Sequence, residues 1–230
     1  MKKILVTGGD GRFANELKQI KTNLNFIYLN KKQLNILSTN SISKAIKKYK
    51  PKQILHLAGL SRPMNIHDKD INKSINLNIK GTANLVTECS KSKIKIIYFS
   101  TSYIYPGKKG DYKETDPLLP WNNYGWSKLG AEAVVQMYKN SLILRVCMTE
   151  KPFIHKNAYV NVKSNFIYQD ELARKFLKII NKTGVYNIGG KSQTIFNFAK
   201  KYNNKVKKIF SKGEFPLKQN MNLNKFNKIT

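Results

Sequence analysis

The chain has 230 residues, of which 41% are hydrophobic and 24% are charged. This usage is typical of globular proteins and argues against disorder or a fibrous class, and the length suits one core with a small appended lobe. The formal charge of +29 is large, but most of the excess is Lys spread along the chain beside frequent Asn and Ile, so we favour compositional drift over a nucleic-acid partner.

The cysteines and the N-terminal segment bear on the compartment. Cys89 and Cys147 lie in apolar surroundings without CxxC spacing or clustered histidines, which argues against a disulfide framework and predicts no metal site. The apolar run that begins at Ile4 stops at Thr7-Gly8-Gly9, and no cleavage-site pattern follows it. No stretch approaches the ~18 apolar residues that a membrane span needs, so we expect a cytoplasmic protein.

Short β-rich runs alternate with longer amphipathic segments in the first two thirds of the chain. The predicted strands are residues 3–7, 26–29, 53–57, 94–100 and 142–146, and the predicted helices are residues 12–20, 41–48, 75–90 and 127–138. This alternation is typical of βαβ units around a parallel sheet. We therefore predict an α/β fold, a Rossmann-like doubly wound parallel sheet, for residues 1–147.

The pattern becomes less regular after residue 147. A helix at 170–180, a strand at 185–188 and a helix at 195–202 are predicted. We expect residues 148–230 to form a small C-terminal substrate-binding lobe with a basic tail. From Lys200 onward the chain has nine Lys and one acid, Glu214, with little apolar periodicity, which favours a partly ordered tail over an RNA-binding arm.

The first strand runs into a TGGDGRFA turn, after which a helix begins. Gly8 permits the tight turn, Gly11 lets the backbone approach a pyrophosphate, and the small Ala14 lets helix and strand pack closely. Backbone amides at Arg12 and Phe13 would face the phosphates at the helix N-terminus. A plain βα turn is the alternative, but the position after the first strand favours dinucleotide binding.

The end of the second strand bears on the choice of cofactor. Dinucleotide-binding folds often hold the ribose hydroxyls with an acid at this place, whereas this chain has Asn30, Lys31 and Lys32. A 2′-phosphate would meet two cations and no carboxylate. Asn30 and Lys31 are therefore candidate cofactor-binding residues, and NADP(H) is modestly favoured over NAD(H).

A Tyr followed four residues later by a Lys is a known catalytic spacing, but in this chain it occurs four times, at Tyr28/Lys32, Tyr105/Lys109, Tyr124/Lys128 and Tyr159/Lys163. The two side chains share a face only in a helix, and only Tyr124 leads into an amphipathic helix. A free phenol has a pKa of about 10, and the Lys128 ammonium would lower that pKa and allow proton exchange with a substrate oxygen. Thr101 would add a hydroxyl at the carboxyl edge of the sheet, where ligands bind in such folds.

With these segments in order, the chain resembles the extended short-chain dehydrogenase/reductase family, particularly its dTDP-4-dehydrorhamnose reductase-like branch. Beyond the Gly-rich turn, the resemblance rests on HLAG at 56–59, NIKGTANL at 78–85, STSYIYPG at 100–107, ETDP at 114–117, LILR at 142–145, FIYQDELA at 166–173 and GVYNIGG at 184–190. It implies that Thr101, Tyr124 and Lys128 occupy the catalytic positions, with Asn78 as a supporting amide. It also implies that Ala58 and Gly59 lie beside the dinucleotide and that the segment at 61–63 lines the cleft.

The resemblance further implies that a nucleotide-activated 4-keto-6-deoxy sugar is reduced at C4 by NAD(P)H while Tyr124 delivers the proton. A homodimer is allowed but not required. Asn30 and Asn35 stand where the family often has Asp, and the chain is shorter than usual in the regions that shape the sugar site. An NAD-dependent nucleotide-sugar epimerase is the alternative, and a catalytically reduced dinucleotide- or nucleic-acid-binding protein is a second. A 4,6-dehydratase is disfavoured because Ser102-Tyr103, rather than Asp-Glu, follows Thr101.

Overall fold

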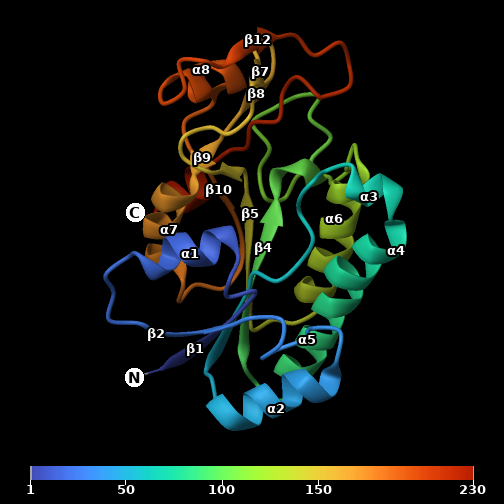
Figure 1. Cartoon of the computed structure of the whole chain (residues 1–230), viewed down its shortest axis with the longest axis vertical. Helices are drawn as coiled ribbons and strands as arrows, with labels where there is room; N and C mark the ends of the chain where they lie inside the picture. Colours follow the sequence, from blue (N-terminus) through green and yellow to red (C-terminus); the bar gives the residue numbers. More distant parts are fainter. Residues whose placement is uncertain (1, 230) are drawn as a thin grey trace.

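The computed structural model describes residues 2–229 and is built around one six-stranded sheet. The strands are β1 (Lys3–Thr7), β2 (Asn25–Leu29), β3 (Gln53–His56), β4 (Lys95–Thr101), β5 (Ser141–Val146) and β10 (Gly184–Ile188), in the spatial order β10-β5-β4-β3-β1-β2. All neighbouring strands run parallel, and helices cover both faces (Figure 1). The predicted doubly wound α/β fold is therefore confirmed.

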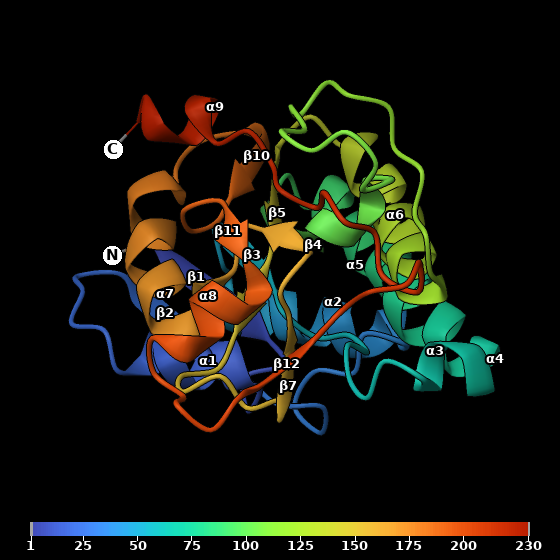
Figure 2. The same cartoon turned by 90° about the horizontal axis from the view of Figure 1, so that it is seen from above.

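The two faces of the sheet carry separate helical layers, which lie on opposite sides in Figure 2. The first layer is α1 (Arg12–Lys18) and α7 (Gln169–Ile179), and the second is α2 (Thr39–Tyr49), α5 (Gly81–Lys91) and α6 (Asn123–Gln136). Every residue of β4 is buried, as expected for a strand covered on both sides. Because side chains alternate along a strand, Ile97 and Phe99 pack with the first layer, and Ile96 and Tyr98 pack with the second.

Short helices join β3 to α5. They are α3 (Ile66–Lys69), α4 (Ile71–Ser74) and η1 (Ile75–Lys80), a π-helical segment that continues directly into α5. The helix predicted at 75–90 is present, but its first part has π-helical geometry, which often marks a functional site. Within residues 2–229, no helix is long and apolar enough to cross a membrane.

A small lobe stands above the carboxyl edge of the sheet (Figure 1). It contains β6 (Met148–Thr149), β7 (Asn157–Tyr159), β8 (Lys163–Ser164), β9 (Ile167–Tyr168), β11 (Gln193–Thr194), α8 (Ile195–Lys200) and β12 (Lys207–Ile209). These strands form the pairs β6-β9, β7-β12 and β8-β11. The lobe has a core of its own, in which Phe153, Val162 and Phe198 are buried.

The predicted boundary at residue 147 needs a correction. The chain enters the lobe after β5, but it then returns to supply α7 and β10 to the central layers. Residues 169–188 therefore belong to the Rossmann-like core. The lobe is formed by the segments that come before and after them in the chain.

The prediction of a partly ordered tail was wrong. We call residues 211–229 the C-terminal strap, because they run back across the molecule and end in α9 (Asn224–Asn227). Phe226 is 1% exposed and Met221 is 2% exposed, and backbone amides of the strap donate to Gly107, Lys163 and Tyr112 carbonyls. Most of the strap is held by hydrogen bonds to distant loops, which leave no pattern in its own sequence, and only Leu223, Phe226 and Ile229 form a short apolar repeat around α9.

Candidate functional site

The predicted catalytic residues meet at the carboxyl edge of the sheet. Thr101 is the last residue of β4, and Tyr124 and Lys128 lie in the first turns of α6. The start of α6 is fixed by Asn122, whose side chain accepts a 2.7 Å hydrogen bond from the Gly125 amide. The Thr101 and Tyr124 hydroxyls are hydrogen-bonded, and the Lys128 ammonium nitrogen lies 4.1 Å from the centroid of the Tyr98 ring. The structure thus brings Thr101 and Tyr124 together, and it places the Lys128 ammonium one helical turn further along α6, against the Tyr98 ring.

Burial and charge shift the proton affinities of this cluster. Burial raises the pKa of Tyr124 to about 12, while the hydrogen bond from Thr101 and the charges of Arg62 and Arg12 act in the opposite direction. Burial lowers the pKa of Lys128 to about 7, against the effect of the Glu132 carboxylate. Lys128 therefore changes charge close to neutral pH. The charges of Arg62 and Arg12 lower the pKa of the Tyr124 phenol. The Tyr/Lys spacing gave no sign of these two residues.

Asn78 lies in η1 and is buried, and its amide is fully engaged with protein groups. Its oxygen accepts from the Leu60 amide at 2.6 Å, and its nitrogen donates to the Leu60 carbonyl at 2.9 Å and to the Ser127 hydroxyl at 2.8 Å. Ser127 in turn donates to the Tyr124 carbonyl at 2.8 Å. Asn78 thus links the loop after β3 to the first turn of α6, an arrangement that positions Tyr124.

The Gly-rich turn packs closely against the loop after β3. Gly8 has a φ of +66°, and a Cβ atom there would lie 2.8 Å from the Ala58 nitrogen. At Gly59 a Cβ atom would lie 3.0 Å from the Asn78 amide oxygen. Gly11 is the N-cap of α1 and provides no side-chain cap, so the first amides of this helix have no such partner. This geometry fits the close approach of a phosphate-bearing ligand.

The other predicted cofactor residues differ in what they expose. The Phe13 ring is buried, with its centroid 4.8 Å from that of Phe99, so only its backbone could meet a ligand. Asn30 forms a turn with Gln33, in which each backbone amide donates to the other residue's side chain. Lys31 is exposed beside it. The Gly9 amide donates to the Leu29 carbonyl at 2.8 Å, which places the end of β2 next to the Gly-rich turn.

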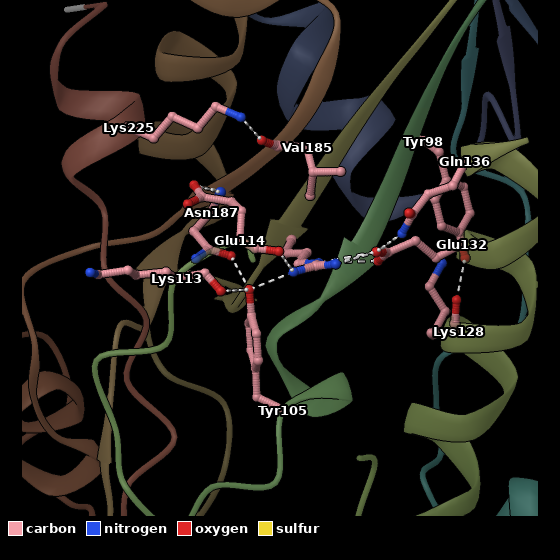
Figure 3. Close-up of polar contacts among 11 residues, drawn as sticks. Tyr98, Tyr105, Lys113, Glu114, Lys128, Glu132, Gln136, Val185, Asn187 and Lys225 are labelled. Carbon is pink, nitrogen blue, oxygen red and sulfur yellow. Dashed lines mark hydrogen bonds and ion pairs between the residues drawn. The ribbon is translucent and has the colours of Figure 1, made fainter. Parts of the chain in front are cut away.

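A buried ion pair behind the cluster was missed by the sequence analysis. Glu132 is 0% exposed, and its carboxylate oxygen lies 2.7 Å from an Arg145 guanidinium nitrogen. Arg145 also donates to the Tyr105 hydroxyl at 2.7 Å, and Tyr105 donates to Asn187 at 2.9 Å. Figure 3 shows Glu132 and Gln136 on one side of this network and Tyr105 and Asn187 on the other. The spacing Tyr124, Lys128, Glu132 along one helix face was the available signal.

Two histidines near the cluster also went unassigned. His67 of α3 is buried, with its ring centroid 5.1 Å from that of Tyr124, and its Nδ1 atom pairs with the Ser74 hydroxyl at 2.8 Å. His56 at the end of β3 lies between the hydroxyls of Thr7 and Thr82, at 2.9 and 3.0 Å. Burial lowers the pKa of both histidines, to about 3 for His56. Both are therefore neutral at pH 7.

Comparisons with known proteins place this arrangement in a family. The family model described as the RmlD substrate binding domain matches residues 1–162. The spore coat polysaccharide biosynthesis protein SpsK of Bacillus subtilis is 32% identical over 149 residues, which are 63% of this chain and 52% of that protein. Methionine adenosyltransferase 2 subunit beta of Pongo abelii is 30% identical over 115 residues, 50% of this chain and 34% of that protein. The chain thus spans about half or less of the length of these relatives.

A solved structure extends the likeness to the whole fold. The dTDP-4-dehydrorhamnose reductase of Bacillus anthracis, determined in complex with NADP, superposes with a TM-score of 0.85 and 20% identity, covering 99% of this chain and 92% of that one. At this identity the match speaks for the fold. Together with the family model, it confirms the resemblance drawn from the motifs: the chain belongs to the RmlD substrate binding domain family.

Proposed function

We propose that this protein is an NAD(P)H-dependent reductase of a nucleotide-activated 4-keto-6-deoxy sugar. The observation that carries the proposal is the hydrogen-bonded pair of Thr101 and Tyr124 at the carboxyl edge of the sheet, with Lys128 one helical turn further along α6. A reductase of this kind needs an acid that gives a proton to the oxygen while hydride reaches the carbon. The reductase named among the similar structures supports this assignment.

The residues of the Gly-rich edge fit a nicotinamide dinucleotide, which when bound would supply the hydride. The fit rests on the close approach of Gly8 to the loop after β3 and on the uncapped start of α1. We infer a modest preference for NADP(H), because Lys31 is exposed at the end of β2 and Asn30 stands where such folds often have a carboxylate. The residues that would hold the dinucleotide are Gly8, Gly11, Arg12, the backbone of Phe13, Asn30, Lys31, Ala58, Gly59, Tyr124 and Lys128.

Within this site, Tyr124 would donate the proton of its hydroxyl to the sugar C4 oxygen. The Thr101 oxygen accepts a hydrogen bond from the Tyr103 amide at 3.3 Å, which leaves its own proton to point at the phenol oxygen and stabilise the phenolate. An ammonium on Lys128 would stabilise the same charge. Asn78 joins α6 to the loop after β3 through its bonds to Ser127 and Leu60. Its proposed role is to position Tyr124.

The test is to incubate the pure protein with NADPH or NADH and a panel of nucleotide-linked 4-keto sugars while following the absorbance of the reduced cofactor. We expect consumption that Tyr124→Phe abolishes. Tyr138→Phe is the matched control, because Tyr138 lies beyond the far end of the same helix, where its hydroxyl makes only a 3.4 Å bond to the Cys89 carbonyl. Sugar isomerisation without net cofactor use would assign the epimerase instead.

A second candidate follows from the match to methionine adenosyltransferase 2 subunit beta, whose name describes a subunit of a transferase rather than a reductase. In that case the chain would bind a dinucleotide and act through a partner. Dinucleotide binding without turnover of any sugar in the panel would favour this reading.

A further inference from the structure

Two arginines lie in the loops that follow β1 and β3. β1 pairs with β2 on one side and with β3 on the other, so the chain reverses its direction of travel across the sheet at this place. Ligands of open α/β sheets bind in the crevice at such a switch point. Arg12 follows the turn after β1, and Arg62 lies in the loop after β3. The two arginines therefore belong to the two loops that flank this switch point.

A single carboxylate joins these two arginines. Glu150 follows β6, where the chain enters the lobe, and its two oxygens lie 2.8 and 2.7 Å from one Arg62 guanidinium nitrogen. One of them lies 3.1 Å from an Arg12 nitrogen, and Arg12 also donates to the Ser61 hydroxyl at 3.2 Å. Glu150 thus joins the loops after β1 and β3 to the start of the lobe.

The charges at this bridge do not balance. Burial by itself raises the pKa of Glu150, but the hydrogen bond from Arg62 and the charges of Arg62 and Arg12 outweigh it, so the pKa is lowered and the carboxylate is ionised at neutral pH. Two guanidinium groups against one carboxylate leave one positive charge. The chain's other two arginines are engaged elsewhere, Arg145 with Glu132 and Arg174 with Asp170.

We propose that Arg12 and Arg62 form a diphosphate-binding pair and that Glu150 is an internal anion which competes with the diphosphate for them. A diphosphate carries at least two negative charges and offers oxygens to both planar guanidinium forks, a geometry that arginine matches well. The diphosphate of a dinucleotide and that of a nucleotide sugar share this chemistry. The choice of these ligands rests on the proposed function. Because the charges of Arg12 and Arg62 also reach the Tyr124 phenol, their occupation is felt at the acid.

The test is calorimetric titration of the full chain with inorganic pyrophosphate, dTDP and NADP+ at fixed salt. We expect Glu150→Gln to tighten binding of at least one of them about twofold to fivefold, the size expected when partly exposed ion pairs stop competing. Glu171→Gln is the control, since it makes the same change of net charge at an exposed site on α7. In an Arg62→Gln background, Glu150→Gln should no longer tighten binding.

The ligand arms separate the sources of the diphosphate. A gain confined to NADP+ assigns the pair to the cofactor, and a gain confined to dTDP assigns it to the sugar nucleotide. Unchanged or weaker binding of all three ligands in Glu150→Gln, with a melting temperature like that of the parent, would overturn the competition. If no sugar is reduced in the assay but Glu150→Gln still tightens binding of a diphosphate ligand, the proposed activity is rejected and the diphosphate-binding pair is supported.

Discussion

Replacement of Glu132 by Gln tests the buried ion pair that lies one turn beyond Lys128. Glu132 and Arg145 are 0% and 2% exposed, and the carboxylate accepts from two Arg145 nitrogens and from Gln136. Glutamine keeps the volume and one acceptor oxygen but removes the charge, so the guanidinium is left buried without its counter-ion. Removal of one partner from a buried pair costs about 3–5 kcal/mol. We take the lower end, about 3 kcal/mol, because Tyr105 and the Glu114 carbonyl still accept from Arg145.

For a chain of this length, about 3 kcal/mol corresponds to a fall of roughly 6–12 °C in melting temperature. Thermal and urea unfolding followed by circular dichroism measure this, with Glu171→Gln as an exposed control that should stay within about 0.5 kcal/mol of the parent. Arg145→Met in the Glu132→Gln background should restore part of the loss, because no unpaired charge remains. If Glu132→Gln is as stable as Glu171→Gln, the reasoning is refuted.

Three further predictions follow from the site and the strap. If the Lys128 ammonium assists the acid, kcat/KM in the reductase assay should fall as pH rises through about 7, where Lys128 loses its proton. Lys128→Met should lower kcat/KM on the order of a hundredfold and flatten its dependence on pH. Gly8→Ala should weaken dinucleotide binding in titrations far more than Gly213→Ala, because both have positive φ but only Gly8 has backbone within 3 Å of the added Cβ. Phe226→Ala should cost about 3–5 kcal/mol of unfolding free energy in urea, since the ring is 1% exposed; an unchanged midpoint would mean that the strap is not docked.

Local patterns sufficed for the central sheet and for the choice of Tyr124. Each of the first five predicted strands lies within one residue of the observed ends. The central strands are buried on both faces and read as apolar runs, and the edge strand β2 is itself a short apolar run. The helix around Tyr124 begins at Asn123 rather than at 127, since its start depends on the Asn122 cap, which apolar periodicity does not record. Tyr124 still stands in a helical turn, as its selection required.

The missed ion pairs join residues that lie far apart in the chain. Glu132 and Arg145 are 13 residues apart, and Arg62 and Glu150 are 88 apart. No spacing rule connects such residues, because the sheet order and the crossings between strands decide which loops meet. In the strap, Leu223, Phe226 and Ile229 recur every third residue, but this run is too short to predict that Phe226 joins the core cluster that includes residues of α7 and β10.

The pKa of Lys128 depends on one of these long-range contacts. A carboxylate four residues further along the same helix face raises the pKa of a lysine, whereas burial lowers it. Burial outweighs the Glu132 carboxylate, which is also paired with Arg145, and the pKa of Lys128 lies at about 7. Arg145 is itself oriented by Tyr105, which donates to Asn187 of β10. The sixth strand, which the chain reaches only after leaving the lobe, is therefore linked through Tyr105 and Arg145 to the carboxylate that raises the Lys128 pKa.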